Sequence, residues 1–209
     1  MRPMAERKHG RPAPETTTEI RHEDWGRQDL SGQQHTAVAF IDVDFSETSN
    51  QGAVFTDCTF RGSRFNCSTH TDAAFVNCTF ARCSLFEAAF TNCKLIGTMF
   101  DRCTFDLLSA EGGDWSFTGL PGADLRKASL RSVRMREVDL TGARCAGATL
   151  RDLDLSGAWL HSADLSRADL RGSDLSSVDP LTTELKRAVI TWEQAVVLVT
   201  TLGLDVRSG

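Results

Sequence analysis

Large apolar side chains recur at every fifth position over most of this chain of 209 residues. Of the 30 positions from 30 to 175 that are multiples of five, 25 carry Leu, Phe, Met or Trp. The remaining positions hold His35, Asn50, His70, Ala110 and Cys145. A period of five is neither the 3.6 of an α-helix nor the 2 of a flat strand. A fixed repeat of this kind predicts a solenoid, in which each repeat packs only on its neighbours.

A second series of positions lies two residues before each large one and carries small side chains. Of the 31 such positions from 28 to 178, 27 hold Ala, Ser, Thr, Cys, Gly or Val. The exceptions are Gln28, Gln33, Leu108 and Leu153. Large and small side chains that alternate and both point inward fill a narrow interior without voids. The residue between them is often Asp, so the local pattern is A-(D/N)-L-x-x, as in residues 163–167.

This pattern, which covers residues from about 30 to 178, resembles the pentapeptide repeat family. The resemblance implies an all-β solenoid: a right-handed quadrilateral β-helix, in which each pentapeptide forms one side and four sides form a coil. Successive coils are then expected about 4.8 Å apart, the usual spacing of neighbouring strands. We expect this β-helix over residues 25–180. Residues 1–24 are charged and Pro-bearing without the repeat, which predicts a disordered N-terminal tail.

Residues 181–209 are expected to form a C-terminal cap. Thr191 and Gln194 have the T-x-x-Q spacing of a helix capping box, an apolar run follows over 195–199, and Gly203 is a typical helix stop. The open end of a solenoid needs such a cover, because its strand edges are unpaired. The helix is apolar around most of its surface, so we expect it to make a homodimer as well. The expected interface is Trp192, Ala195, Val196, Val199 and Leu202. The alternative is a cap without dimerisation.

Three further sequence features bear on the interior. Phe fills most large positions up to 105 and Leu takes over later, with five Gly and Pro residues between 112 and 122. This change predicts an irregular coil near 106–122 without a break in register. Asn50 and His70 would be stacked neighbours, either as a satisfied polar pair or as a ligand site. Five of the seven cysteines lie at small positions and are interpreted as buried thiols.

Charge and motifs exclude several functional classes. The net charge of −5 argues against general binding to nucleic acid or to an anionic membrane, which both require excess Lys and Arg. Neither a signal peptide nor an apolar membrane span is visible, so a cytoplasmic location is expected. The cysteines lack C-x-x-C metal spacing, and no nucleophile elbow, P-loop or H-E-x-x-H occurs. We therefore expect no enzyme activity, no cofactor and no metal.

The resemblance is nearer to the mycobacterial fluoroquinolone-resistance type of this family than to the plasmid-borne Qnr relatives, whose repeat is interrupted by loops. It is carried by residues 76–80, 122–126, 177–180 and the terminal 193–204. It implies a dimeric rod shaped like B-DNA that binds DNA gyrase in place of DNA. Such a rod inhibits gyrase or protects it from quinolone-type poisons, as drug resistance or as self-immunity. The alternative is an interaction scaffold with a partner other than gyrase.

The sequence supports DNA-like shape better than DNA-like charge. Duplex DNA carries about one charge per 1.7 Å of its axis, far more than −5 spread along a whole rod. Mimicry therefore needs a local cluster, and the best candidates lie near the C-terminal end: Asp139, Asp154, Asp164, Asp169, Asp174 and Asp179. The alternative for each Asp is a turn role, since its side chain can bind local N–H groups. Phe86 and Leu107 are outward apolar residues and form a second candidate partner patch.

Overall fold

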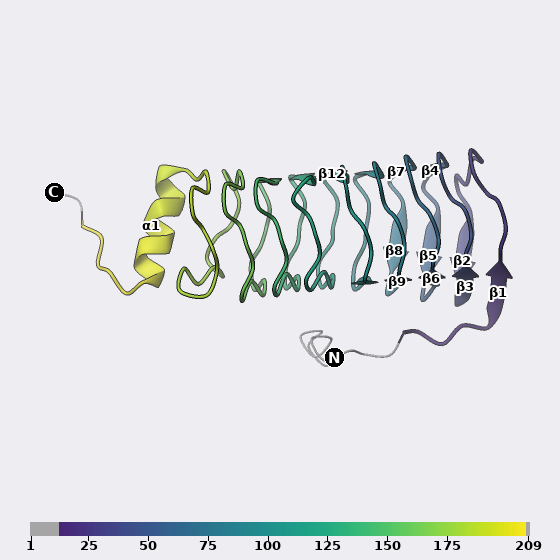
Figure 1. The fold of residues 1–209 in the computed structure, drawn as a ribbon, viewed down its shortest axis with the longest axis horizontal. Coiled ribbons are helices and arrows are strands. Elements are labelled where there is room, and N and C mark those ends of the chain that lie inside the picture. Colours follow the sequence, from purple (N-terminus) through teal and green to yellow (C-terminus); the bar gives the residue numbers. More distant parts are fainter. Residues whose placement is uncertain (1–12, 208–209) are drawn as a thin grey trace.

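The computed structural model describes residues 13–207, which form one rod of stacked coils. Strand β1 lies at one end of the rod and helix α1 lies across the other (Figure 1). Paired residues are 20 apart in the sequence, as in Ile20 with Phe40 and Phe40 with Phe60, and every strand pair is parallel. The predicted parallel β-solenoid with a C-terminal helix is therefore confirmed.

Three of the four long faces of the rod carry short strands. The β1 face consists of β1 (Thr18–Arg21), β3 (Val38–Ile41), β6 (Thr59–Arg61), β9 (Thr79–Ala81) and β11 (Met99–Asp101). The β4 face consists of β4 (Ser49–Gln51), β7 (Thr69–Thr71), β10 (Ala89–Thr91), β12 (Ser109–Glu111), β13 (Ser129–Arg131) and β14 (Thr149–Arg151). The β2 face consists of β2 (Gln34–Thr36), β5 (Val54–Thr56) and β8 (Ala74–Val76).

The fourth face, here named the bridge face, is joined by isolated parallel bridges. They connect residues 24, 44, 64, 84 and 104 in one series and residues 124, 144, 164 and 184 in another. The single helix of the described residues, α1 (Trp192–Thr201), follows the last coil.

The large positions build columns of stacked rings along the axis. Phe40, Phe60, Phe80 and Phe100 stack with ring centroids 4.9, 4.6 and 4.9 Å apart. These distances match the expected coil spacing, because each ring sits directly over the one in the next coil. All four rings are at most 6% exposed, so the column is a continuous apolar core.

Two deviations from the large–small order compensate for each other. Leu108 and Ala110 exchange sizes, and both are buried. Gly113 then stands at a small position two residues before Trp115, which is 1% exposed. A Cβ at Gly113 would lie 2.1 Å from the backbone oxygen of Cys93, so only glycine permits this close approach of two coils. Large and small side chains thus still alternate in the interior, but at these positions they exchange places.

The polar pair at the large positions is internally satisfied. Asn50 Nδ2 lies 3.2 Å from His70 Nδ1, and His70 Nε2 lies 3.0 Å from the hydroxyl of Ser68. The Asn50 side-chain oxygen accepts the N–H of Ala53 at 3.0 Å. Both side chains are at most 3% exposed, and burial lowers the pKa of His70 to about 3. A neutral imidazole in a closed hydrogen-bond chain agrees with the structural interpretation of this pair.

The solenoid is longer at both ends than its predicted limits of 25 and 180. Residues 18–21 were predicted to be disordered, but they form β1, which pairs along its length with β3. Ile20 packs against the core there, because its side chain falls on the same large position one coil before Phe40. The remainder of the predicted tail, residues 1–12, lies outside the described residues. At the other end, Glu184 and Val189 still pair with the preceding coil.

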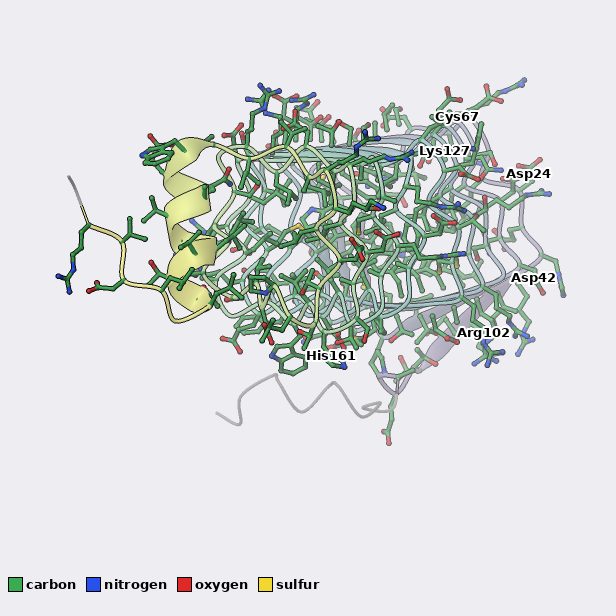
Figure 2. All side chains as sticks on the ribbon, turned by 60° about the vertical axis from the view of Figure 1, so that its left-hand side comes forward. Asp24, Asp42, Cys67, Arg102, Lys127 and His161 are labelled. Carbon is green, nitrogen blue, oxygen red and sulfur yellow. The ribbon has the colours of Figure 1, made fainter. Side chains whose placement is uncertain are left out.

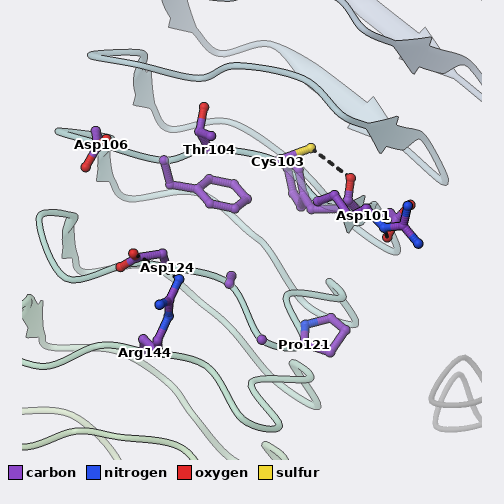
Figure 3. Close-up of a pocket in the computed structure, with 12 residues that line it drawn as sticks. Asp101, Cys103, Thr104, Asp106, Pro121, Asp124 and Arg144 are labelled. Atoms are coloured by element: carbon purple, nitrogen blue, oxygen red, sulfur yellow. Dashed lines mark hydrogen bonds and ion pairs between the residues drawn. The ribbon is translucent and has the colours of Figure 1, made fainter.

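The bridge face is interrupted at one place, between residues 101–107 and residues 121–127. Within the described chain no bridge joins Thr104 to Asp124, although both are bridged on their other sides. The same two coils stay hydrogen-bonded on the β1 face and on the β4 face, so the register is kept. This opening lies where the sequence predicts an irregular coil. Figure 3 shows its two edges, with Thr104 and Asp106 on one and Pro121 and Asp124 on the other.

Candidate interaction surfaces

The candidate acidic residues share one local structure. Each follows an inward residue, which is small except for Leu153 before Asp154, and its carboxylate accepts the N–H of the residue two positions later. Asp164 accepts from Ser166 at 2.9 Å, and Asp174 accepts from Ser176 at 2.9 Å. Asp179 accepts from Leu181 at 2.9 Å. The turn role that the sequence offered as an alternative is therefore present, and it leaves the second carboxylate oxygen for other contacts.

Arginines neutralise two of the six acids. Arg171 binds Asp169 through two nitrogens at 2.9 and 2.8 Å, which lowers the pKa of Asp169 to about 2. Arg136 Nε donates to Asp154 at 2.6 Å. These two carboxylates contribute little net charge to a surface, since a cation lies directly against each.

Asp164, Asp174 and Asp179 make no ion pair with any residue in the part of the chain that the structure describes. They lie on three different faces of the last complete coil, so they surround the rod and do not form one patch. Asp179 is exposed, and the other two are half-buried. Glu184 adds a fourth acid, one coil after Asp164, and the backbones of the two residues form a parallel β-bridge. The Glu184 carboxylate accepts the N–H of Lys186 at 3.0 Å. The sequence could have indicated Glu184, because it directly precedes Leu185 in the same five-residue frame.

Asp139 does not belong to the exposed set, and its predicted place on an acidic surface is wrong. It is 8% exposed, and its carboxylate accepts the N–H of Thr141 at 2.9 Å. It lies in a ladder between Gly119 and Trp159, one in each neighbouring coil. This position leaves the carboxylate facing the wall of the rod more than the solvent.

Helix α1 covers the end of the rod with one side and exposes the other. Leu198 packs on the core, and Gln194 is 7% exposed. The predicted capping box is present: the hydroxyl of Thr191 accepts the N–H of Gln194 at 3.4 Å, and the Gln194 side chain accepts the Thr191 N–H at 2.7 Å. The predicted interface residues Trp192 and Leu202 are 76% and 47% exposed, and Ala195, Val196 and Val199 are half-buried.

Other exposed apolar side chains lie around this end of the rod. Leu181 is 82% exposed, Val189 is 45% exposed and Leu204 is 58% exposed. Together with the outer side of α1 they form the terminal apolar surface, a name used below for residues 181, 189, 192, 195, 196, 199, 202 and 204. A concentration of large apolar side chains at one end is typical of a surface that another molecule covers.

The second candidate patch consists of two exposed apolar side chains. Phe86 is 40% exposed and Leu107 is 47% exposed, and they lie at the same corner of two successive coils. Charged side chains project along the rest of the rod, as Asp24, Asp42, Arg102 and Lys127 do in Figure 2. Exposed apolar side chains of this kind are common on protein surfaces, so a partner contact at this patch stays a prediction.

Residues 13–207 contain no group of three or more His, Cys, Asp or Glu side chains placed to hold a metal ion. The same residues contain no helix able to cross a membrane, since α1 has only 10 residues.

Two family models match the chain, and they cover different parts of the rod. The pentapeptide repeat model matches in eight copies over residues 116–144 and 139–176. The solenoid is built from pentapeptide repeats. Residues 20–105 match the model of the SV2A/B/C luminal domain, and in this structure they form the same 20-residue coils as the pentapeptide-repeat segment that follows.

Two solved structures align with this chain. A trypsin-treated variant of QnrB1, a plasmid-mediated fluoroquinolone resistance protein, aligns at a TM-score of 0.52 with 23% identity, over 92% of this chain and 99% of QnrB1. HetL, a pentapeptide repeat protein involved in heterocyst differentiation regulation in the cyanobacterium Nostoc sp., aligns at 0.42 with 17% identity, over 84% of this chain and 89% of HetL. No curated protein sequence matches. At this identity the likeness to QnrB1 shows the fold, and the expected nearness to the mycobacterial type stays a prediction.

Proposed function

We propose that this pentapeptide-repeat rod binds DNA gyrase at the surface that normally holds duplex DNA. Bound there, it inhibits the enzyme, protects it from quinolone-type poisons, or does both. Two observations support the proposal: the family that the sequence resembles, and the fold shared with QnrB1, itself a fluoroquinolone resistance protein. The feature of this chain that carries it is the ring of unpaired acids, Asp164, Asp174, Asp179 and Glu184, beside the terminal apolar surface.

The proposal includes a homodimer formed through the terminal apolar surface. Trp192, Ala195, Val196, Val199 and Leu202 have spacings of three and four residues, so they share one side of α1. That side faces away from the rod, since Gln194 and Leu198 occupy the side that packs on it. Two rods joined end to end would place both acid rings near the centre of a structure twice as long.

A central acidic ring is the charge pattern that suits a basic DNA-binding groove. Surface carboxylates without a protein cation raise the local negative potential, and complementary potential speeds and directs association. Asp169, on the fourth face of the same coil, and Asp154, one coil before Asp174, contribute less, because Arg171 and Arg136 bind them. The contact on this rod is therefore expected close to α1.

A gyrase supercoiling assay tests the proposal directly. Increasing amounts of the protein are added to gyrase and relaxed plasmid, with and without a quinolone. We expect supercoiling to fall as the protein is added, or cleavage stimulated by the quinolone to fall at lower protein concentration. If both supercoiling and quinolone-stimulated cleavage are unchanged at every concentration, the proposal is wrong.

The acid ring is tested with a variant that separates charge from turn geometry. Asp164→Asn, Asp174→Asn and Asp179→Asn together remove three charges but keep a side-chain oxygen for the turn hydrogen bonds. The matched control is the triple variant Asp24→Asn, Asp29→Asn and Asp44→Asn at the far end, where the carboxylates make the same turns. We expect the first variant to need on the order of tenfold more protein for half-inhibition, equal to about 1.4 kcal/mol, and the control to match the wild type.

The second candidate function is a scaffold for a partner other than gyrase. The exposed Phe86 and Leu107 favour it, because they lie away from the acid ring and α1. Fold alone does not decide between the two, since one fold hosts many functions. If the wild-type protein leaves both supercoiling and quinolone-stimulated cleavage unchanged, this second function is favoured.

A further inference from the structure

The opening in the bridge face leaves backbone groups of two coils without partners. One coil earlier the N–H groups of Arg82, Leu85 and Glu87 donate to the carbonyls of Asp101, Thr104 and Asp106 at 2.8–2.9 Å. The equivalent donors at the opening are the N–H groups of Arg102, Phe105 and Leu107, and none has an acceptor within the described chain. On the facing edge, the N–H of Asp124 has no acceptor in the preceding coil. The N–H groups of Thr104 and Arg144, at the same place in their own coils, each donate to a carbonyl of the coil before.

The two edges enclose a real cleft. It has a volume of about 430 Å³ and is lined by residues 100–106 and 121–124, with Arg144. Part of its lining is uncovered: Cys103 is half-buried, whereas Cys83, in the same place one coil earlier, is 2% exposed. Pro121 is the first residue of the edge formed by residues 121–127, and it has no N–H to donate. Figure 3 shows Cys103 and Thr104 facing Pro121 and Asp124 across this cleft.

The neighbouring coils define which side chains would fill the cleft. The large positions on either side are Phe105 and Leu125, and the small positions are Cys103 and Ala123. A strand placed between them continues both columns only if it carries a small residue and, two positions later, a large apolar one. The coils remain joined on the faces at either side, so the strand can be only about three to five residues long, each residue spanning about 3.3 Å.

The charges at the cleft are already balanced. Asp106 pairs with Lys127 at 3.4 Å across the opening. Asp124 pairs with Arg126 at 2.6 Å and with Arg144 at 3.1 Å, and its pKa is lowered to about 2, chiefly by the Arg126 hydrogen bond. No unpaired charge remains at these residues to attract an oppositely charged ligand. Recognition would rest on main-chain hydrogen bonds and on the two inward side chains.

We propose that this opening is a docking site for an extended, uncharged segment of a partner protein with the pattern small-x-large apolar. The segment adds a parallel strand between the two coils and takes up the unpaired N–H and C=O groups on both edges. This is recognition by strand addition, in which the backbone gives affinity and alternate side chains give specificity. The proposal rests on the hydrogen bonds that are missing at the opening in the bridge face, and it is independent of gyrase binding.

Amide hydrogen exchange on the full chain tests both the opening and the docking. In the free protein, the N–H groups of Arg102, Phe105 and Leu107 should exchange much faster than those of Arg82, Leu85 and Glu87, which are hydrogen-bonded at the same places one coil earlier. Equal, slow exchange of the two sets would show a closed wall and overturn the proposal.

The ligand probe is an uncharged five-residue peptide with blocked ends that keeps the small-x-large pattern of residues 103–105, with Ala in place of Cys: acetyl-Ser-Ala-Thr-Phe-Ser-amide. At saturation it should slow exchange of the three open N–H groups by on the order of tenfold or more, and leave the control set unchanged. The same peptide with Asp in place of its Phe, or with N-methylated amides, should give no protection. Absence of protection by the parent peptide, or equal protection by the N-methylated one, would contradict strand addition.

Discussion

The side-chain amide of Gln194 donates a hydrogen bond to the main-chain oxygen of Leu170 at 2.7 Å, across 24 residues of sequence. The same NH₂ group donates to the oxygen of Ser173 at 2.7 Å, and the Gln194 side-chain oxygen accepts the N–H of Thr191. One buried side chain thus completes the start of α1 and covers two carbonyls at the open end of the solenoid. The polar groups of the last coil that water would otherwise bind are satisfied by the helix.

Replacing this residue should loosen the end of the rod. We expect Gln194→Ala to lower the free energy of unfolding by about 2–4 kcal/mol, because buried polar groups lose their partner. Urea denaturation followed by circular dichroism measures the change. Glu193→Ala, at the exposed neighbouring position, is the control and should cost no more than about 0.5–1 kcal/mol. Equal midpoints for the wild type and Gln194→Ala would show that the two carbonyls do not depend on Gln194.

The buried imidazole should make stability depend on pH. The pKa of His70 is about 3 in the folded chain and about 6.5 when unfolded, so only the unfolded chain takes up a proton between these values. Stability is full above pH 6.5 and falls as the pH falls, by about 2 kcal/mol between pH 7.5 and pH 5.

The variant His70→Phe isolates this effect. Its column partner Phe90 stacks on His70 at 4.7 Å, so a phenyl ring can continue the column. The readout is the difference in unfolding free energy between the two pH values, and not the absolute stability, which also changes when Asn50 and Ser68 lose a partner. A variant that keeps the wild-type pH dependence would assign it to other groups.

Dimerisation should depend on the outer side of α1. We expect Trp192→Asp with Val199→Asp to give monomers by sedimentation velocity at concentrations where the wild type is a dimer, because a carboxylate cannot be buried in an apolar contact without a partner. Leu107→Asp, an exposed apolar residue distant from α1 in the sequence, should leave the mass unchanged. A wild-type chain that sediments as a monomer would reduce α1 to a cap.

The stacked Phe column should dominate the energetics of the Phe-rich coils. Phe60 is fully buried between Phe40 and Phe80, and Phe60→Ala is expected to cost about 3–5 kcal/mol. Phe86 carries the same side chain at 40% exposure, and Phe86→Ala should stay within about 0.5 kcal/mol of the wild type. Chemical denaturation of the two variants gives both values, and similar losses would mean that Phe86 is packed in solution.

The fold was predictable because its information is local and repeated. Each large–small pair indicates the inward direction, and the capping box at Thr191 and Gln194 marks α1. The N-terminal limit was wrong because the repeat was taken to start at Leu30, although Ile20 and Trp25 occupy the two preceding large positions of the same frame. Glu23 stands at the small position before Trp25, so the large–small pair is imperfect there, and pairing with β3 is what identifies the strand.

The candidate surfaces were less predictable, because side-chain partners depend on three dimensions. The sequence placed Asp139 and Asp164 in the same class, yet one is nearly buried and the other is not. The arginine that neutralises Asp154 lies 18 residues away, at a distance that only the coil geometry makes short. The second role of Gln194 and the missing hydrogen bonds at Phe105 likewise have no local signal.

The opening between residues 101–107 and 121–127 also bears on how the rod comes apart. In a solenoid each coil is stabilised by its two neighbours, so cooperativity passes along the axis from coil to coil. At this junction a face of the coupling is missing, and the Phe-rich coils before it and the Leu-rich coils after it become separate cooperative blocks. The later block keeps its helical cover when the earlier one melts, so a partly denatured chain would still present the acid ring and α1.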